Sequence, residues 1–316
     1  MSTDIGGAKL KRGEKARGFL TVGEAATHEV KLPYIVLNGV GPGPTLCVLG
    51  GVHALECAPV EALLRLGREM DARNLGGRLI LVPVVNTEGF HRRTPYHNDL
   101  DHLNQNRVFP GDLTGSMTRR VASTVFDQFV SKADYLVDAH SADLGEDASR
   151  SVIIWQTTDE ALQQKMVEIA SCFDVDYIES SPIEGQTGEA VKRFGIPCIM
   201  TESGAPYPIR EVDIKFHLEG LKNLMRHLRM LPGEVKLVNV PLNPRSERLY
   251  SGHGGAWRKK VEIGQRVKEG DRLGEVSNLI GDEMQVVDAP FEGKITFLRT
   301  HYSVNAGDTL LTITEV

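Results

Sequence analysis

Between Thr45 and Arg229, short apolar runs alternate with amphipathic segments. The runs are bounded by turn-forming residues, which is typical of buried strands. Two of the segments between them, Pro59 to Met70 and Thr118 to Phe129, repeat apolar residues at helical spacing. This alternation predicts an α/β fold with a mixed or largely parallel sheet flanked by helices. The predicted strands are TLCVLGG, RLILVPVVN, DYLVDAH, SVIIWQT and PCIMTES.

The pattern changes after Leu231-Pro232-Gly233, where short valine-rich segments punctuated by glycine continue to the end of the chain without a helical period. We therefore expect two domains, an α/β domain over residues 1–232 and a small all-β domain over residues 233–316. Within the second, the segment Arg266 to Val276 is echoed by Ser303 to Ile313, with Val, Gly, Asp and Leu in register. The echo predicts two related hairpins.

This half-repeat resembles the biotinyl and lipoyl domains of the barrel-sandwich type. In those domains a lysine on the hairpin between the two halves carries the cofactor. Here Gln285 stands where the lysine is expected. The resemblance therefore implies a barrel-sandwich-like fold with a structural or pocket-rimming role, and no swinging-arm carrier.

Composition narrows the range of partners. The 316 residues carry a formal net charge of −6, so no overall positive field is available to bind nucleic acid or an anionic membrane. The basic start of the chain is not followed by an apolar signal core, and no apolar run is long enough to cross a bilayer. We expect a cytoplasmic protein that binds a small molecule. Its oligomeric state is left open by the sequence, and a homo-oligomer is one alternative.

Candidate metal ligands follow two of the predicted strands. His53 and Glu56 come after TLCVLGG, whose glycines let the chain turn at the strand end, and His140 ends DYLVDAH. Two histidines and a glutamate form a ligand set used by catalytic zinc, with a fourth position left for water. Asp138 precedes His140 on the same face of its strand and could orient it. Alone, the H-x-x-E pair is weak, because a glutamate also favours a helix start.

Two further segments carry candidate chemistry. The long polar loop from Asn86 to Asp112 ends in NQNRVFPG, where Asn106 and Arg107 could bind a carboxylate, although a solvated basic face is the alternative. In the stretch IPCIMTESG, Glu202 directly follows an apolar strand and is succeeded by Ser203 and Gly204. Its carboxylate could take a proton from a zinc-activated water and return it to a leaving amine, whereas an exposed strand-end glutamate is the simpler interpretation.

Taken together in this order and spacing, GGVHALE, RTP, NQNRVFPG, DAHS and TESG resemble the succinylglutamate desuccinylase and aspartoacylase family, which is related to the zinc carboxypeptidases. The resemblance implies a zinc hydrolase, with one zinc per chain, that removes an acyl group from an N-acylated amino acid or a related small carboxylate. The implied zinc ligands are His53, Glu56 and His140. Further implied roles are general base and acid for Glu202, carbonyl contact for Arg93, and substrate-carboxylate contacts for Asn106 and Arg107.

The sequence departs from the family pattern in two places. Ala54 stands where glycine is usual, and the common D-L-N-R reads Asn104 to Arg107, without the aspartate. In this respect the pattern is closer to the deacetylases of N-acetyl-diaminobutyrate than to the aspartoacylases. Two other functions use the same residues: a metallocarboxypeptidase acting on a small peptide, and a non-catalytic ligand-binding relic.

Overall fold

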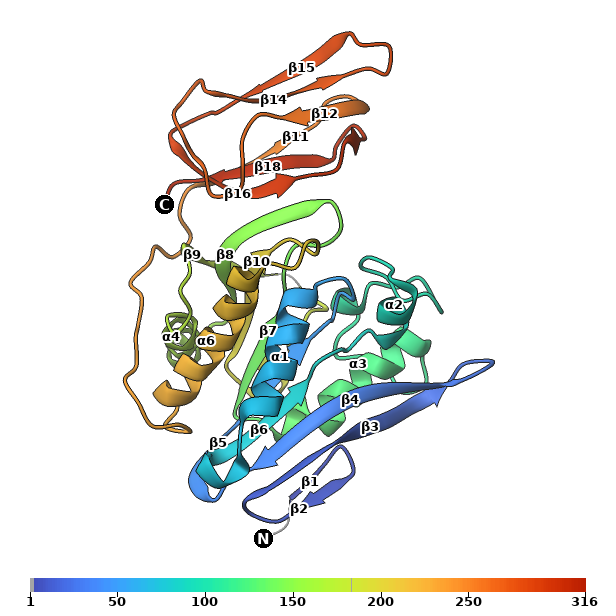
Figure 1. Ribbon diagram of the computed structural model, residues 1–316, viewed down its shortest axis with the longest axis vertical. Helices are drawn as coiled ribbons and strands as arrows, with labels where there is room; N and C mark the ends of the chain where they lie inside the picture. Colours follow the sequence, from blue (N-terminus) through green and yellow to red (C-terminus); the bar gives the residue numbers. More distant parts are fainter. Residues whose placement is uncertain (1–2, 183) are drawn as a thin grey trace.

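The computed structural model describes residues 3–182 and 184–316, and its centre is a mixed sheet (Figure 1). Four neighbouring strands run parallel in the spatial order β6, β5, β7 and β10. They are continuous apolar runs because both faces of a parallel sheet are covered. Each strand predicted from the sequence is formed. The bounds are β5 Gly41–Gly50, β6 Gly76–Val82, β7 Tyr135–Ala139, β8 Glu146–Trp155 and β10 Cys198–Gly204.

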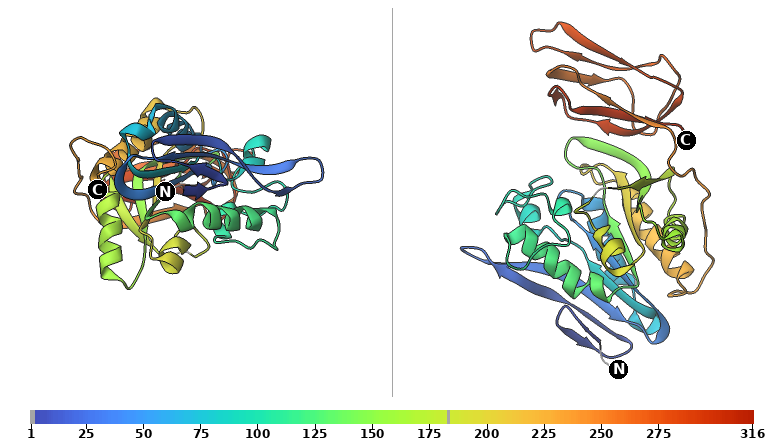
Figure 2. Two further views of the ribbon diagram at one scale, coloured as in Figure 1. Left: turned by 90° about the horizontal axis from the view of Figure 1, so that it is seen from below. Right: turned by 180° about the vertical axis from the view of Figure 1, so that it is seen from behind.

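Helices cover both faces of this sheet. Helices α1 and α6 pack beside each other on one face, and α3 lies against the other (Figure 2). The two helices predicted from the sequence, α1 and α3, are confirmed to within two residues at each end, the usual uncertainty of helix boundaries. The bounds are α1 Cys57–Glu69, α2 Thr87–Arg92, α3 Met117–Gln128, α4 Glu160–Ala170, α5 Glu189–Phe194 and α6 Glu211–His227.

Strands near the N-terminus extend the sheet beyond the part predicted from the sequence. The hairpin of β3 and β4 is antiparallel, and β4 joins it to β6. Strand β3 lies at the edge and alternates exposed with half-buried positions. It lacks the continuous apolar run of a buried strand, which explains why the sequence pattern did not reveal it. Strands β1 Thr3–Ile5 and β2 Ala8–Leu10 form a separate two-stranded sheet, and the bounds of the other two are β3 Glu14–Glu24 and β4 Glu29–Asn38.

The other edge of the sheet continues into the C-terminal β-region, defined here as residues 246–316. Strand β16 pairs with β8, and β18 and β11 follow in order, so a single sheet runs through both parts of the chain. A separate four-stranded sheet of β15, β14, β12 and β17 completes the region, at the end of the molecule opposite the N-terminus (Figure 1). The bounds are β11 Ser246–Tyr250, β12 Gly255–Lys259, β13 Arg266–Val267, β14 Arg272–Ser277, β15 Glu283–Asp288, β16 Gly293–Arg299, β17 Ser303–Val304 and β18 Thr309–Thr314. Strand β9 Tyr177–Ser181 lies outside this region and pairs with β8.

The half-repeat forms a different structure from the hairpins expected. Within the described residues, β13 pairs with β16 while β14 pairs with β12 and β15, so the first copy crosses from the large sheet to the small one. The second copy crosses in the opposite direction, from β17 to β18. Gln285 binds the backbone, accepting from Gly252 N at 2.7 Å and donating to Tyr250 O at 3.0 Å. A barrel-sandwich fold stays a prediction.

Buried apolar side chains form two clusters, one drawn from residues 5–230 and one from residues 257–313. The two clusters suit a two-domain organisation, although the shared sheet joins them. The boundary between residues 232 and 233 stays a prediction. In the described part of the chain, no helix combines the length and the apolar character needed to cross a membrane.

Candidate metal centre

The carboxyl ends of β5 and β7 bring the candidate ligands together. These strands are parallel neighbours, so their ends meet at one edge of the sheet. At the end of β5 the backbone turns at Gly51, which has a φ of +55°, and a Cβ there would lie 3.1 Å from the Cα of Val84. Only glycine suits this close turn. The turn leads His53 and Glu56 into the start of α1, facing His140 after β7.

The ligand atoms of these three residues lie within 4.8 Å of one another. Nδ1 of His53 is 2.7 Å from Oε1 of Glu56, and Nδ1 of His140 is 2.7 Å from Oε2 of the same carboxylate. His53, Glu56 and His140 are 8%, 2% and 1% exposed. The predicted set therefore forms a buried, convergent group with the donor types that zinc prefers.

The outer nitrogens of both imidazoles also face acceptors. Nε2 of His53 is 3.1 Å from Oδ1 of Asn104, and Nε2 of His140 is 3.1 Å from Oδ2 of Asp138, an ion-pair distance. When Nε2 carries the hydrogen, each Nδ1 presents a lone pair to an oxygen of Glu56. Two acceptors 2.7 Å apart need a proton or a metal ion between them. The residues present therefore fit a divalent cation.

The pKa shifts agree with this need for positive charge. Burial raises the pKa of Glu56, but His140 and His53 outweigh it and hold the pKa near 2. Burial lowers the pKa of His140, and Asp138 and Glu56 outweigh it and raise the pKa well above the ordinary value. Without a bound metal, a proton on His140 would supply positive charge where a cation would otherwise lie.

Beside the candidate metal ligands lies a cavity of about 560 Å³. Glu202 of β10 lines it together with His53 and Glu56, and burial raises the pKa of Glu202 well above its ordinary value. The C-terminal β-region supplies another part of the lining. Its residues in the lining are Ser246, Arg248, Tyr250, Thr296, Phe297, Arg299, Thr309 and Thr312.

The family model of the succinylglutamate desuccinylase/aspartoacylase catalytic domain matches residues 42–228 of this chain. The chain belongs to this family. The resemblance seen in the motifs is thereby confirmed.

Relatives of known name agree with this assignment. The N-alpha-acetyl-L-2,4-diaminobutyric acid deacetylase of Halomonas elongata is 28% identical over 305 residues, which is 93% of this chain and 88% of that protein. The product-bound ectoine utilization protein EutE (DoeB) from Ruegeria pomeroyi is 25% identical, with a TM-score of 0.87 over 97% of each chain. A succinylglutamate desuccinylase/aspartoacylase from Rhodobacter sphaeroides, 21% identical with a TM-score of 0.87 over 99% of each chain, shows the same fold.

Asn104 has a structural role that the sequence did not reveal. It stands where the family's D-L-N-R has aspartate, and its Oδ1 accepts from Nε2 of His53 and from the backbone N of Asn106 at 2.8 Å. A side-chain oxygen at this position therefore still orients the histidine. The signal in the sequence was the replacement of the family's aspartate by Asn104, close to the predicted substrate contacts Asn106 and Arg107.

The remaining predicted residues lie outside the cavity lining. Asn106 is buried, with Oδ1 unpaired among the described residues, and the exposed Arg107 donates from Nη1 to the carbonyl of Asn106 at 2.7 Å. Arg93 is exposed and follows the last residue of α2. The structure brings the candidate metal ligands close to Glu202, and the roles of all the predicted site residues stay predictions.

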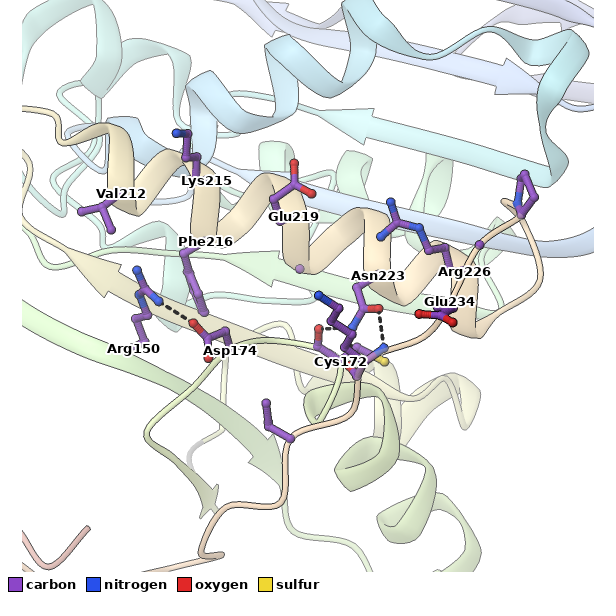
Figure 3. Close-up of a pocket in the computed structure, with 15 residues that line it drawn as sticks. Arg150, Cys172, Asp174, Val212, Lys215, Phe216, Glu219, Asn223, Arg226 and Glu234 are labelled. Atoms are coloured by element: carbon purple, nitrogen blue, oxygen red, sulfur yellow. Dashed lines mark hydrogen bonds and ion pairs between the residues drawn. The ribbon is translucent and has the colours of Figure 1, made fainter.

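A larger hollow of about 910 Å³ lies along α6 and the segment that follows it (Figure 3). Arg150 and Asp174 form an ion pair of 2.7 Å on its wall. It holds none of the predicted site residues, and the described residues contain one group able to bind a metal, at His53, Glu56 and His140. Convergent chemistry rather than volume therefore identifies the site.

Proposed function

We propose that this protein is a zinc-dependent deacylase that hydrolyses the amide bond of N-acylated amino acids. The observation that carries the proposal is the buried group of His53, Glu56 and His140 beside Glu202, in one cavity. Membership of the deacylating family supports it. The proposed zinc ligands are these two histidines and Glu56.

Bound zinc would polarise the scissile carbonyl and lower the pKa of water to roughly 7, which gives a nucleophile near neutral pH. Glu202, next to the ligands in the cavity, takes the proton of the attacking water and passes it to the leaving amine. Burial raises the pKa of this carboxyl, which helps it to hold the proton taken from water until the amine leaves.

Residues of the long loop would orient the substrate. Arg107 is exposed and its guanidinium can bind a carboxylate through two hydrogen bonds, with the buried amide of Asn106 beside it. Arg93 would face the oxygen of the scissile carbonyl, where developing negative charge needs a cation. These contacts would hold the scissile amide over the proposed metal ligands. The substrate would then be aligned before the reaction, which lowers the entropic part of the activation barrier.

Charge in the cavity favours an acylated diamino acid. Besides Glu56 and Glu202, the lining includes Asp143, Glu146 and Glu179 against two arginines, Arg248 and Arg299. Even with the two positive charges of a bound zinc, the carboxylates outnumber the positive charges by one, so an ammonium group on the substrate would restore balance, whereas a second carboxylate would increase the surplus. The Halomonas relative is named for such an acylated diamino acid.

The proposal is tested by hydrolysis of a substrate panel. Purified protein, with its zinc content measured, is incubated with N-acetyl-2,4-diaminobutyrate, N-acetylaspartate, N-succinylglutamate and short peptides. We expect turnover of the diamino compound, lost with a chelator and restored by zinc. Preferred cleavage of peptides would favour the metallocarboxypeptidase, and stoichiometric zinc without any turnover would favour the ligand-binding relic.

Glu202→Gln tests the assigned proton carrier. The amide keeps the shape of the side chain but cannot accept the proton, so we expect normal zinc content and turnover reduced by about 100-fold or more. The exposed Glu269→Gln serves as the matched control and should behave as wild type. Near-normal turnover in Glu202→Gln would refute the assignment.

A further inference from the structure

The inference concerns Tyr96, which lies on the long loop and lines the cavity. Its ring meets the ring of His53 edge-on, with centroids 5.1 Å apart and planes at 76°. Tyr96 also has a φ of +56°, a left-handed conformation that is rare outside glycine and that surrounding contacts must hold in place. The contacts that hold this residue therefore bear on a proposed metal ligand.

Two carboxylates hold Tyr96. Its backbone N donates to Oδ2 of Asp143 at 3.0 Å, and its hydroxyl donates to Oε2 of Glu146 at 2.7 Å. The other oxygen of Glu146 accepts from Nη2 of Arg299 at 3.4 Å. Arg299 is anchored in turn, since its Nε donates to the carbonyl of Thr309 at 2.6 Å.

Arg299 and Glu146 face each other directly across the pairing of β16 with β8. Their side chains are 18% and 15% exposed, so solvent screens the pair only weakly. The chain of contacts leads from the C-terminal β-region through the central sheet to the loop over His53. All of these contacts are formed between residues of the protein itself.

We infer that Arg299, in the C-terminal β-region, and Glu146, on β8, are positioning residues that hold Tyr96 against the ring of His53. The link to catalysis rests on the proposed function, whereas the structural coupling does not. The guanidinium holds the carboxylate, and the carboxylate holds the phenol. Removing Arg299 should therefore loosen a loop about two hundred positions away in the sequence.

The first test is hydrogen–deuterium exchange of the full-length protein, read on peptides covering residues 94–105. In Arg299→Gln we expect exchange about fivefold faster there, the effect of losing one hydrogen bond of about 1 kcal/mol. Glu146→Gln, which removes the charge from the middle of the chain, should give the same change. Arg272→Gln is the matched control, because it breaks an arginine–carboxylate pair of the same region, with Asp288, outside the cavity lining.

A double-mutant cycle separates positioning from a general loss of stability. If Arg299 acts through the phenol, Tyr96→Phe should reproduce the faster exchange, and adding Arg299→Gln to it should change little more. Additive effects, or loop exchange equal to wild type in both Arg299→Gln and Glu146→Gln, would overturn the inference. Zinc affinity, measured by chelator competition, should fall about tenfold in each single variant.

The outcomes for the two proposals are distinguishable. A wild-type protein that binds no zinc and turns over no acyl amino acid would contradict the proposed function, while the exchange cycle would still decide the coupling. Conversely, zinc-dependent activity together with unchanged hydrogen–deuterium exchange of the loop in Arg299→Gln would support the proposed function and contradict the inference.

Discussion

At the residue scale, each candidate histidine has oxygen atoms close to both of its ring nitrogens. The inner Nδ1 atoms of His53 and His140 converge on Glu56, and the outer nitrogens face Asn104 and Asp138. Outer partners of this kind set the tautomer and the orientation of a metal ligand. The two histidines differ in the charge of that partner, which is a neutral amide for His53 and a carboxylate for His140.

Asn104→Ala tests the amide partner. The substitution removes the acceptor for Nε2 of His53, so we expect zinc to bind about 10–100-fold more weakly, as measured by competition with a chelator. Asn104→Asp keeps an acceptor oxygen at the same position and should retain affinity. Equal zinc affinity in the alanine variant and wild type would show that His53 needs no such partner.

At the element scale, the junction between β10 and α6 determines where Glu202 lies. Strand β10 ends at Gly204, which has a φ of +88°, and its pairing with β8 shifts register between Glu202 and Gly204. Asp213 in the first turn of α6 accepts from Ser203 Oγ at 3.0 Å and from Arg210 Nε at 2.6 Å. These bonds tie the strand end to the helix and so support the proposed proton carrier.

Gly204→Ala should destabilise this junction. A Cβ there would lie 2.5 Å from Cγ of Asp213, in addition to the strain of the positive φ, so we expect the free energy of unfolding to fall by roughly 2–4 kcal/mol. The matched control is Gly195→Ala, which shares a positive φ but meets nothing within 4 Å and should cost about 1 kcal/mol. Urea denaturation measures both, and equal losses would contradict the close contact with Asp213.

At the scale of the whole molecule, the pairing of β8 with β16 joins two hydrophobic cores through one sheet. The chain has two tryptophans, and each lies buried in a different core: Trp155 on β8 and Trp257 on β12. Fluorescence can therefore report on each part separately.

We expect both parts to unfold together, because breaking either one exposes the shared sheet and the cavity between them. Trp155→Phe leaves the reporter of the C-terminal β-region, and Trp257→Phe leaves the reporter of the larger part. Once each variant's own stability change is taken from circular dichroism, its fluorescence transition in urea should coincide with its loss of secondary structure. Two separated transitions would mean that the parts are independently stable.

The sequence by itself determined the features that short stretches encode. Continuous apolar runs specified β5, β7 and β10. A strand buried on both faces is apolar along its length, so the sequence reveals it without knowledge of its neighbouring strands. Position at or just beyond the carboxyl ends of such strands singled out His53, His140 and Glu202 as candidates among many polar residues. The motifs joining them were enough to identify the family.

Only the tertiary structure decided what pairs across long separations. The edge strand β3 carries no continuous apolar run, and the half-repeat gave no sign that its two copies cross between sheets. The contact of Asn104 with His53 and that of Arg299 with Glu146 join residues 51 and 153 positions apart. Such contacts depend on which strands become neighbours, a property of the global packing that no local pattern of side chains contains.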